Sequence, residues 1–383
     1  MKRIGIITLV NVNNYGAELQ AFATQRALQQ MGLDAEIIDY PYFINSRHKK
    51  TKGSKPNFKM PLKLKVIVML YPLLQWYKKI KQDKLILHRR KENFKSFHNR
   101  NTKFSGEYQT AESLVSGKMD YDVFVVGSDQ VWNPNNYTSL DPYFLKFAPE
   151  GKRKISYASS FGVSVLPEHT RDYYKEALNR LDAVSVREEN AVQLVEEISG
   201  VKAHWVLDPT LLLSGNEWKQ YGKDIVGLPE NFVLIYEVTP CDYVKQLALS
   251  VAEELGCKVV RINCDANRCE SDNEIINILD AGPAEFVWLF SQAKMIVTNS
   301  FHGTAFSLNM QKDFFVVSPE RKQNNSRQKS LLRLVNQENR LIVEGAQMPK
   351  KESFHVDYSR VNPLLETARE KSKNYLINAI YGK

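Results

Sequence analysis

A histidine and several hydroxyl side chains stand together where an apolar run changes into a helical pattern. The run Lys294–Thr298 predicts a buried strand, and the residues from Gly303 onward predict the helix that follows it. A helix N-terminus attracts phosphate or carboxylate because its backbone N–H groups are unpaired and its dipole is positive there. His302 would move protons beside such an anion, and Ser300, Gly303 and Thr304 would bind it. In the alternative interpretation, His302 caps the helix and Ser300 satisfies a backbone donor.

A polar bend that contains a glycine follows the first apolar run of the chain. Asn13, Asn14 and Tyr15 occupy this bend and are candidate ligand-binding residues. A turn with a helix cap is the alternative interpretation. The spacing G-x-G-x-x-G is absent, which disfavours a nicotinamide cofactor.

A second polar cluster follows the apolar run Tyr121–Val126. Asp129 places a carboxylate directly after this run, and Gln130 could hydrogen-bond to the hydroxyls of a sugar. Trp132 could stack on the apolar face of a sugar ring. The alternative is a tight turn with Trp132 in the core.

Two arginines could bind an anionic ligand. Arg187 follows the apolar run Ala183–Val186, and a guanidinium at that position can clamp a carboxylate or phosphate. Its alternative partners are neighbouring acids such as Glu188 and Glu189. Arg327 ends a polar, positively charged loop that is either a mobile flap or a solvated linker.

The elements that must position these side chains alternate between strands and helices, which is typical of βαβ units in parallel sheets. We therefore expect an α/β protein with two doubly wound, Rossmann-like domains that face a cleft. Residues 1–215 would form the first domain, with a basic, partly apolar insertion at about 46–105 that lies outside the core. Residues 216–345 would form a donor-binding domain, and the helix within residues 346–383 would pack back on the first domain.

The net charge of +9 is unevenly distributed along the 383 residues. Residues 46–105 hold eighteen Lys or Arg against two acidic residues, so the remainder of the chain is acidic on balance. The segment 66–77 within this block is too short to span a bilayer, and its Trp and Tyr are typical of a lipid headgroup layer. This pattern indicates either an interfacial anchor for an anionic membrane or a helix on the protein's own surface. We expect no nucleic-acid partner.

The cysteines and histidines form no recognisable metal site or disulfide framework. The four cysteines lack C-x-x-C spacing, and the seven histidines make no H-x-x-x-H or H-x-E pattern. No apolar segment has the length of a membrane span. We therefore expect a cytoplasmic protein that uses neither a metal nor a cofactor. Alternatively, the protein is attached peripherally to the inner face of the membrane.

The polar motifs, taken in order, resemble the polysaccharide pyruvyl transferase family. The similarity extends from residue 4 to about residue 335 and rests on the following motifs: Asn11–Gly16, Val126–Trp132, Ser156–Gly162, Ser185–Glu189, Leu207–Thr210 and Thr298–Thr304. The family implies a fold like that of the GT-B glycosyltransferases. It also implies transfer of pyruvate from phosphoenolpyruvate to a sugar, often as a cyclic ketal.

By position, His302 matches the family's catalytic histidine and Arg187 its donor-binding arginine. Ser300 and Phe301 precede the histidine here, whereas some members carry a basic residue there; this difference raises the importance of Arg187 and Arg327 for carboxylate recognition. The resemblance implies phosphoenolpyruvate as the donor, without metal, and a saccharide acceptor. If the basic segment touches the membrane, a lipid-linked oligosaccharide of capsule or exopolysaccharide synthesis becomes the favoured acceptor.

Two other functions remain open. The two-domain fold also serves glycosyltransferases that use a nucleotide sugar. Alternatively, the protein is not an enzyme and binds glycans or a membrane surface through the basic segment 46–105. The three functions differ in what they consume. A pyruvyl transferase consumes phosphoenolpyruvate, a glycosyltransferase consumes a nucleotide sugar, and a binding protein consumes neither.

Overall fold

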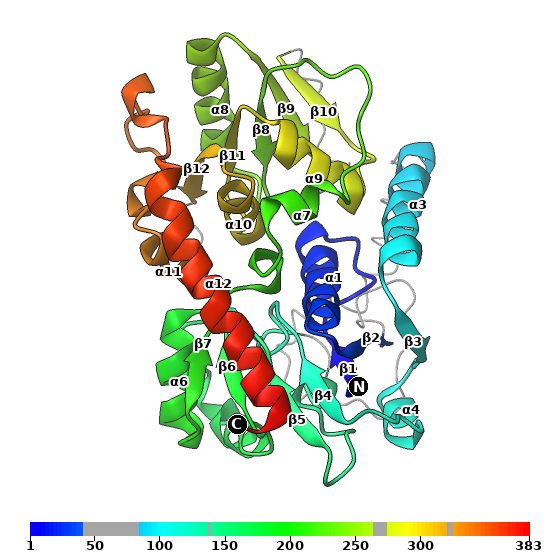
Figure 1. The fold of residues 1–383 in the computed structure, drawn as a ribbon. Helices are drawn as coiled ribbons and strands as arrows, with labels where there is room; N and C mark the ends of the chain where they lie inside the picture. Colours follow the sequence, from blue (N-terminus) through cyan, green and yellow to red (C-terminus); the bar gives the residue numbers. More distant parts are fainter. Residues whose placement is uncertain (41–83, 137–138, 263–273, 320–324) are drawn as a thin grey trace. The chain divides into compact units, whose positions relative to one another are not determined.

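The computed structural model describes residues 1–40, 84–136, 139–262, 274–319 and 325–383 (Figure 1). The chain divides into two compact units. Unit 1 comprises residues 1–66, 98–212 and 367–383, and unit 2 comprises residues 67–97 and 213–366. Each unit is described by itself, over its described residues.

Unit 1 is built on a parallel sheet of five strands in the order β3-β2-β1-β4-β5. Strands β6 and β7 pair with each other in parallel, and isolated bridges such as the one from Ile155 to Ala183 connect this pair to the edge at β5. The strands are β1 (Arg3–Ile7), β2 (Asp34–Asp39), β3 (Phe104–Glu107), β4 (Val123–Val126), β5 (Arg153–Ser156), β6 (Val184–Val186) and β7 (Ala203–Trp205).

Helices cover both faces of this sheet, as expected where every strand is paired in parallel. They are α1 (Tyr15–Gln30), α4 (Ala111–Ser116), α5 (Arg171–Leu178) and α6 (Glu189–Ser199), with short 3₁₀ turns η1 (Pro142–Phe144), η2 (Glu168–Thr170) and η3 (Pro209–Leu211). Strand β4 is wholly buried because its four residues, all Val or Phe, meet apolar side chains on both faces.

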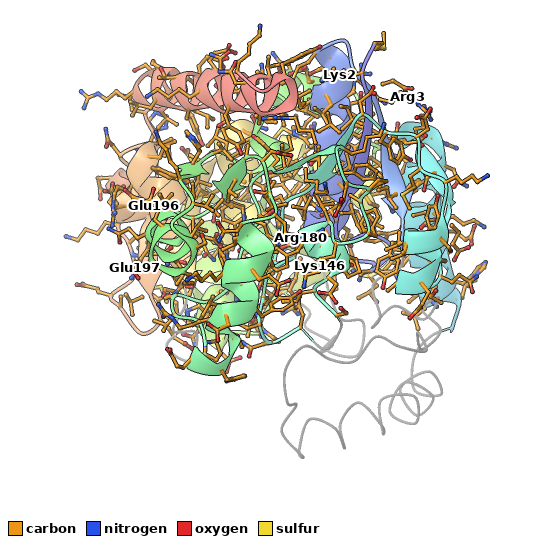
Figure 2. All side chains as sticks on the ribbon, turned by 90° about the horizontal axis from the view of Figure 1, so that it is seen from below. Lys2, Arg3, Lys146, Arg180, Glu196 and Glu197 are labelled. Atoms are coloured by element: carbon orange, nitrogen blue, oxygen red, sulfur yellow. The ribbon has the colours of Figure 1, made fainter. Side chains whose placement is uncertain are left out.

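Helix α6 illustrates how sequence pattern places a helix on the sheet. Leu194 and Val195 are buried on its inner face, whereas Glu196 and Glu197 are exposed to solvent (Figure 2). Gly200 ends the helix in the left-handed conformation, with φ of 71°. Helix α1 differs because it is buried nearly all round, so its polar residues Gln20 and Gln25 lie in the interior.

Unit 2 has a parallel sheet of six strands in the order β10-β9-β8-β11-β12-β13. The strands are β8 (Phe232–Tyr236), β9 (Lys258–Ile262), β10 (Ile275–Ile278), β11 (Met295–Thr298), β12 (Asp313–Ser318) and β13 (Leu341–Val343). Its helices are α7 (Gly215–Lys219), α8 (Asp242–Leu255), α9 (Pro283–Gln292), α10 (Phe301–Asn309) and α11 (Ser326–Leu334), with η5 (Glu338–Arg340) and η6 (Lys351–Ser353).

Two long helices have residues in both units. Helix α3 is Lys84–Asn101 and α12 is Tyr358–Tyr381. Within unit 2, the hydroxyl of Tyr358 donates to the carbonyls of Ser307 and Lys312. Within unit 1, Arg369 donates to the carbonyl of Leu211 at 2.7 Å.

The predicted alternation of strands and helices is confirmed, with one difference at the basic segment. The segment 46–105 was expected to lie outside the core, but its last part does not. Phe97 is buried, and Phe104 begins strand β3, which pairs with β2. The high density of lysines and arginines led to the wrong prediction for these residues. Isolated aromatic residues in such a segment can bury their rings while the charged groups of neighbouring lysines stay in water. The apolar stretch 66–77, which carries the membrane-anchor hypothesis, lies outside the described residues. Among the described helices, none is long and apolar enough to cross a membrane.

Candidate functional site

Each sheet reverses its strand order at one point, and the candidate residues cluster there. In unit 1 the chain leaves β1 toward β2 on one side and β4 toward β5 on the other. In unit 2 the same reversal occurs between β8 and β11. Such a switch point opens a crevice at the carboxyl ends of the two strands, where ligands of open α/β sheets bind.

In unit 2, the loop after β11 is fixed to the loop after β8 by one side chain. Asn299 accepts a hydrogen bond from the backbone of Val238 at 3.0 Å and donates to the carbonyl of Thr239. Ser300 is the N-cap of α10, and its hydroxyl accepts from the backbone of Gly303 at 3.3 Å. The two loops at the unit 2 switch point are therefore held together as one rigid edge.

His302 is the second residue of α10 and lies at this edge. Its side chain is 8% exposed and its ring meets that of Phe301 edge-on, with centroids 5.3 Å apart. A Cβ at Gly303 would lie 2.2 Å from the hydroxyl of Thr298, so only glycine lets the helix start this close to the strand. Thr304 donates to the carbonyl of Ser300 and is wholly buried. The first turn of the helix is thus backbone-rich and compact, which is the form that anion sites at helix N-termini take.

Arg327 lies near the start of α11 and is partly exposed. The next residue, Gln328, donates from its side chain to the carbonyl of Asn299 at 3.3 Å. The start of α11 therefore lies against the loop that carries His302. The preceding residues 320–324 lie outside the described part of the chain.

In unit 1, the loop after β1 is ordered by its own side chains. Asn14 caps α1 by accepting from the backbone of Ala17 at 3.2 Å, as the capping interpretation proposed. Asn13 is exposed with φ of 51°, and Tyr15 is buried. Of the three predicted acceptor ligands in this loop, only Asn13 and Asn14 have exposed side chains.

The loop after β4 brings Asp129 to the switch point and sends Trp132 into the core. Asp129 has φ of 70°, a left-handed conformation that is costly for a non-glycine residue. The ring of Trp132 is wholly buried, stacks on Phe144 at 5.1 Å and donates to the carbonyl of Tyr143. The ring and the N–H of Trp132 therefore make all their contacts inside the core. The predicted stacking of Trp132 on a sugar is wrong, because no face of the ring is exposed. Gln130 holds its own loop, since its side chain accepts from Asn133 at 2.6 Å.

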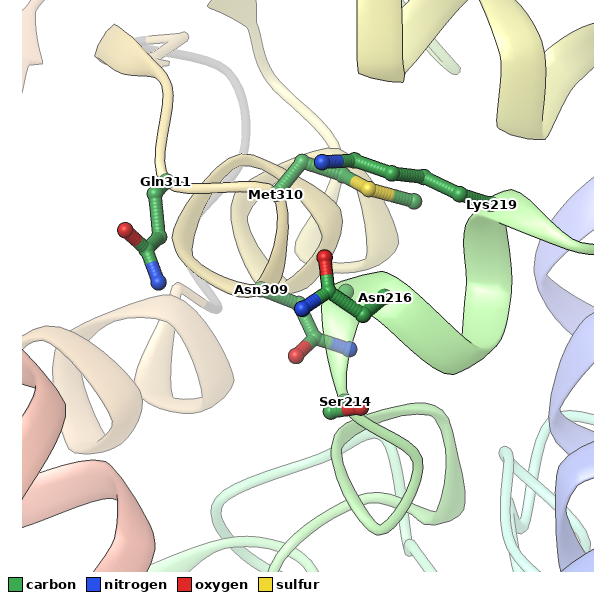
Figure 3. A pocket seen from close by; sticks show the side chains of 7 residues that line it. Ser214, Asn216, Lys219, Asn309, Met310 and Gln311 are labelled. Carbon is green, nitrogen blue, oxygen red and sulfur yellow. The ribbon is translucent and has the colours of Figure 1, made fainter.

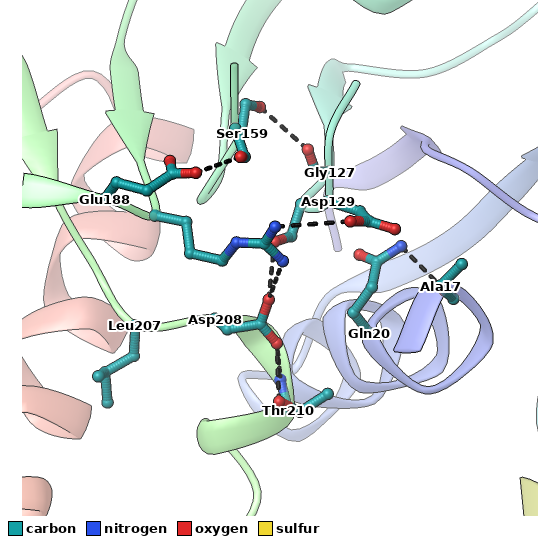
Figure 4. Close-up of polar contacts among 12 residues, drawn as sticks. Ala17, Gln20, Gly127, Asp129, Ser159, Glu188, Leu207, Asp208 and Thr210 are labelled. Atoms are coloured by element: carbon teal, nitrogen blue, oxygen red, sulfur yellow. Dashed lines mark hydrogen bonds and ion pairs between the residues drawn. The ribbon is translucent and has the colours of Figure 1, made fainter. Parts of the chain in front are cut away.

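Arg187 lies in a buried network of charges that the structure centres on Asp208 (Figure 4). Its guanidinium donates to Asp208 at 2.9 Å and lies 3.5 Å from Asp129, with only 1% of the side chain exposed. Burial opposes the charged form, but the carboxylates of Asp208 and Asp129 outweigh it and hold the pKa of Arg187 above its usual value. Asp208 also accepts from the hydroxyl of Ser128 and from the backbone and hydroxyl of Thr210.

A pocket of about 300 Å³ lies in unit 2 but not at His302 (Figure 3). It is lined by Ser214 and Lys219 of the α7 region and by Asn309 and Gln311 at the end of α10. Because His302 is at the start of α10 and this pocket is at its end, the two belong to different places on the unit. Among the described residues there is also no group of three or more His, Cys, Asp or Glu that could hold a metal ion.

Sequence reasoning missed two residues that the structure brings to the unit 1 edge. Asp208 was part of the motif Leu207–Thr210 but had no role of its own, and its pairing with Arg187 joins residues 21 positions apart. Nothing in the sequence pointed to a functional role for Gln20, except that it is a polar residue in a helix that is buried on most sides. Its wholly buried amide donates to the hydroxyl of Thr8 at 2.9 Å.

Solved structures with the same fold include UDP-GlcNAc 2-epimerases. The enzyme from Neisseria meningitidis, bound to UDP-GlcNAc, is 8% identical with a TM-score of 0.51, and the match covers 100% of both chains. The enzyme from Methanocaldococcus jannaschii, in complex with UDP-GlcNAc and UDP, is 14% identical with a TM-score of 0.50 over 100% of both chains. At these identities the likeness concerns the fold alone. It confirms the prediction of two parallel α/β sheets of the GT-B type. Among curated proteins there is no match.

The family comparison covers most of the chain. The family model described as polysaccharide pyruvyl transferase matches residues 14–321, a range that includes both switch points. It contains Asp129, Arg187, Asp208 and His302. The chain therefore belongs to the polysaccharide pyruvyl transferase family.

Proposed function

We propose that this protein transfers pyruvate from phosphoenolpyruvate to hydroxyl groups of a sugar, forms a pyruvate ketal and releases phosphate during capsule or exopolysaccharide synthesis. Family membership supports the reaction class. The observation that carries the proposal is the place of His302, a titratable side chain in the first turn of α10 at the unit 2 switch point. There it is next to the part of the fold best suited to an anionic donor.

The donor site is proposed at the start of α10. Phosphoenolpyruvate carries a phosphate and a carboxylate, and the positive end of the α10 dipole favours such an anion. The N–H groups of Gly303 and Thr304 bond to Ser300 and hold the shape of this first turn. Phe301 would provide an apolar wall for the methylene group. Arg327 would supply positive charge from α11, because its helix is held to the same loop through Gln328.

His302 is proposed to transfer a proton during addition. Protonation of the methylene carbon of phosphoenolpyruvate makes the central carbon electrophilic, and a sugar hydroxyl forms a C–O bond to that carbon while losing its proton. A second hydroxyl of the same sugar then forms another C–O bond to that carbon, and the bond from the carbon to the phosphate oxygen breaks. Phosphate leaves with the electron pair of that bond and takes up the proton that the second hydroxyl loses. A positioned general acid or base contributes a factor of about 10²–10⁴ to such a step.

Asp129 is proposed to receive the acceptor hydroxyl. Its side chain is 16% exposed, whereas those of Arg187 and Asp208 are 1% and 0% exposed. Among these charged groups it is therefore the one whose side chain is partly exposed. Family resemblance assigns Arg187 to the donor, but its two carboxylate partners favour a role in positioning Asp129.

A donor-consumption assay tests the proposal. The purified protein is incubated with a mixture of bacterial glycolipids and oligosaccharides, together with either phosphoenolpyruvate or UDP-sugars. Phosphate release and the mass added to the acceptor are measured. Consumption of phosphoenolpyruvate with a mass gain that corresponds to a pyruvate ketal is expected. Consumption of UDP-sugars alone would instead identify a glycosyltransferase and overturn the proposal.

A further inference from the structure

A buried acceptor atom at the unit 1 switch point has no donor. The side chain of Gln20 is wholly buried, and its amide nitrogen uses both of its protons, one on the hydroxyl of Thr8 at 2.9 Å and one on the carbonyl of Ala17 at 3.0 Å. Its carbonyl oxygen, Oε1, has no hydrogen-bond partner within the described part of the protein. Buried carbonyl groups are nearly always paired, so this oxygen needs an explanation.

The network around Gln20 places it beside Asp129. The Thr8 hydroxyl that accepts from Gln20 donates in turn to the carbonyl of Ser128 at 3.0 Å, and Asp129 is the next residue. Figure 4 shows the amide end of Gln20 turned toward the carboxylate of Asp129. One carboxylate oxygen of Asp129 lies 3.5 Å from Arg187, and the other has no protein partner among the described residues. Two acceptor oxygens without donors, one from helix α1 and one from the loop after β4, therefore lie at the same switch point.

The charges of this edge determine which ligand suits it. Arg187 is the cation of the network, and the carboxylates of Asp208, Asp129 and Glu188 are close enough to raise its pKa. Three carboxylates against one guanidinium leave the edge negative, which opposes a phosphate or a carboxylate ligand. A neutral ligand that brings O–H donors satisfies both acceptors without adding charge.

We propose that Gln20 and Asp129 together bind two hydroxyl groups of one neutral sugar, and that Arg187 is a positioning residue that holds Asp129 rather than a ligand of the donor. This inference rests on the proposed function, because a pyruvate ketal joins two hydroxyls of the same sugar. Each acceptor atom orients one hydroxyl. Asp129, as a carboxylate, is the member of the pair that can accept a proton, so the hydroxyl held by Asp129 adds first and the one held by Gln20 closes the ketal.

Binding of simple sugars tests the proposal without any donor. The probes are methyl glycosides of galactose, glucose and mannose, whose binding to the full-length protein is measured by saturation-transfer NMR and by thermal shift. The variants are Gln20→Met and Asp129→Asn. Gln25→Met is the matched control, because Gln25 lies on the same helix, is equally buried, and bonds through both ends of its amide to the backbone of Lys103.

We expect a glycoside to bind the wild type and Gln25→Met equally and to bind Gln20→Met about tenfold more weakly, as loss of one good hydrogen bond predicts. Phosphoenolpyruvate binding, measured by calorimetry, should remain within about twofold in all three variants, since the donor is bound elsewhere. Equal glycoside binding by Gln20→Met and wild type would mean that a water molecule alone satisfies Gln20, and would overturn the proposal.

Two further outcomes separate this proposal from the proposed function. If no glycoside of the panel binds the wild type, or if Asp129→Asn loses phosphoenolpyruvate instead of sugar, the assignment of this edge to the acceptor is wrong although phosphate release from phosphoenolpyruvate can still be observed. If the glycoside binds through Gln20 but phosphoenolpyruvate is never consumed, the sugar site stands and the proposed transfer fails.

Discussion

The two switch points share a topology but differ in chemistry. At the unit 1 edge, the chain places a buried arginine among three carboxylates, and Asp129 has a left-handed backbone. At the unit 2 edge, the neutral side chains of Asn299 and Ser300 hold the start of α10. The first arrangement offers acceptor atoms and negative charge, and the second offers the positive end of a helix dipole. One edge therefore suits hydroxyl groups and the other suits an anion.

The fold therefore determines where a ligand binds, but it does not determine which ligand binds there. Both edges arise from the same rule of strand order. Their preferences come from a few side chains that follow the strands, such as Asp129 after β4 and His302 after β11. Changes at either edge therefore test whether the two preferences are independent.

Replacing His302 by Gln should abolish most of the proposed reaction while the fold persists. Gln keeps a polar side chain in the first turn of α10 but cannot transfer a proton near neutral pH. We expect phosphate release from phosphoenolpyruvate to fall by about 10²–10⁴-fold, with little change in melting temperature. His355→Gln serves as the control in the same unit, because the side chain of His355 is 81% exposed. A rate for His302→Gln close to that of the control would show that unit 2 has no proton carrier at this position.

Replacing Arg187 by Met should destabilise unit 1 by about 3–5 kcal/mol, because it leaves buried carboxylates without their cation. The double variant Arg187→Met with Asp208→Asn removes both members of the shortest pair and should recover much of this loss. Melting temperatures from calorimetry compare the two. The double variant should also keep its affinity for phosphoenolpyruvate, measured on the folded protein. A selective loss of that affinity would assign Arg187 to the donor and remove the contrast between the edges.

Replacing Gly303 by Ala should affect the unit 2 edge by steric means. The added Cβ would lie 2.2 Å from the Thr298 hydroxyl, so helix α10 must shift away from β11 at a cost of about 1–3 kcal/mol. We expect weaker binding of phosphoenolpyruvate as well as a lower melting temperature. The double variant with Thr298→Ala removes the obstructing oxygen and should recover part of both losses. If the double variant is no better than the single one, close packing is not what Gly303 provides.

Much of the fold could be predicted from the sequence because central strands are apolar runs. The run Lys294–Thr298 predicted a buried strand, and β11 is Met295–Thr298. The edge strands β3 and β10 were not predicted, because both are short and only partly buried. Strand β3 is mostly polar, and Asn277 interrupts the isoleucines of β10. Sequence thus predicts what is buried on both faces better than what lies at a sheet edge.

The candidate site residues that the sequence could suggest are those whose type and position after a strand point to chemistry. His302 and Asp129 were selected because they follow apolar strands. The partners of Arg187 could not be chosen, since Asp208 and Asp129 are 21 and 58 residues away in the chain and only the fold brings them together. The predicted stacking role of Trp132 depended on exposure, and its ring is wholly buried. Burial of a large aromatic side chain depends on tertiary packing that a local pattern does not reveal.

The smallest predicted effect concerns backbone strain at the unit 1 edge. Ala158, just after β5, has φ of 53°, and Ala35 in β2 belongs to the same apolar cluster and is equally buried. Either alanine changed to glycine loses a buried methyl group, worth about 0.8 kcal/mol, and adds chain entropy worth about 0.5–1 kcal/mol. At Ala158 alone, glycine also relieves a left-handed conformation that costs about 1–2 kcal/mol. Ala35→Gly should therefore lower the melting temperature by several degrees, whereas Ala158→Gly should leave it nearly unchanged. Equal losses would show that this edge stores no strain at Ala158, and the contrast with the unit 2 edge would then rest on charge alone.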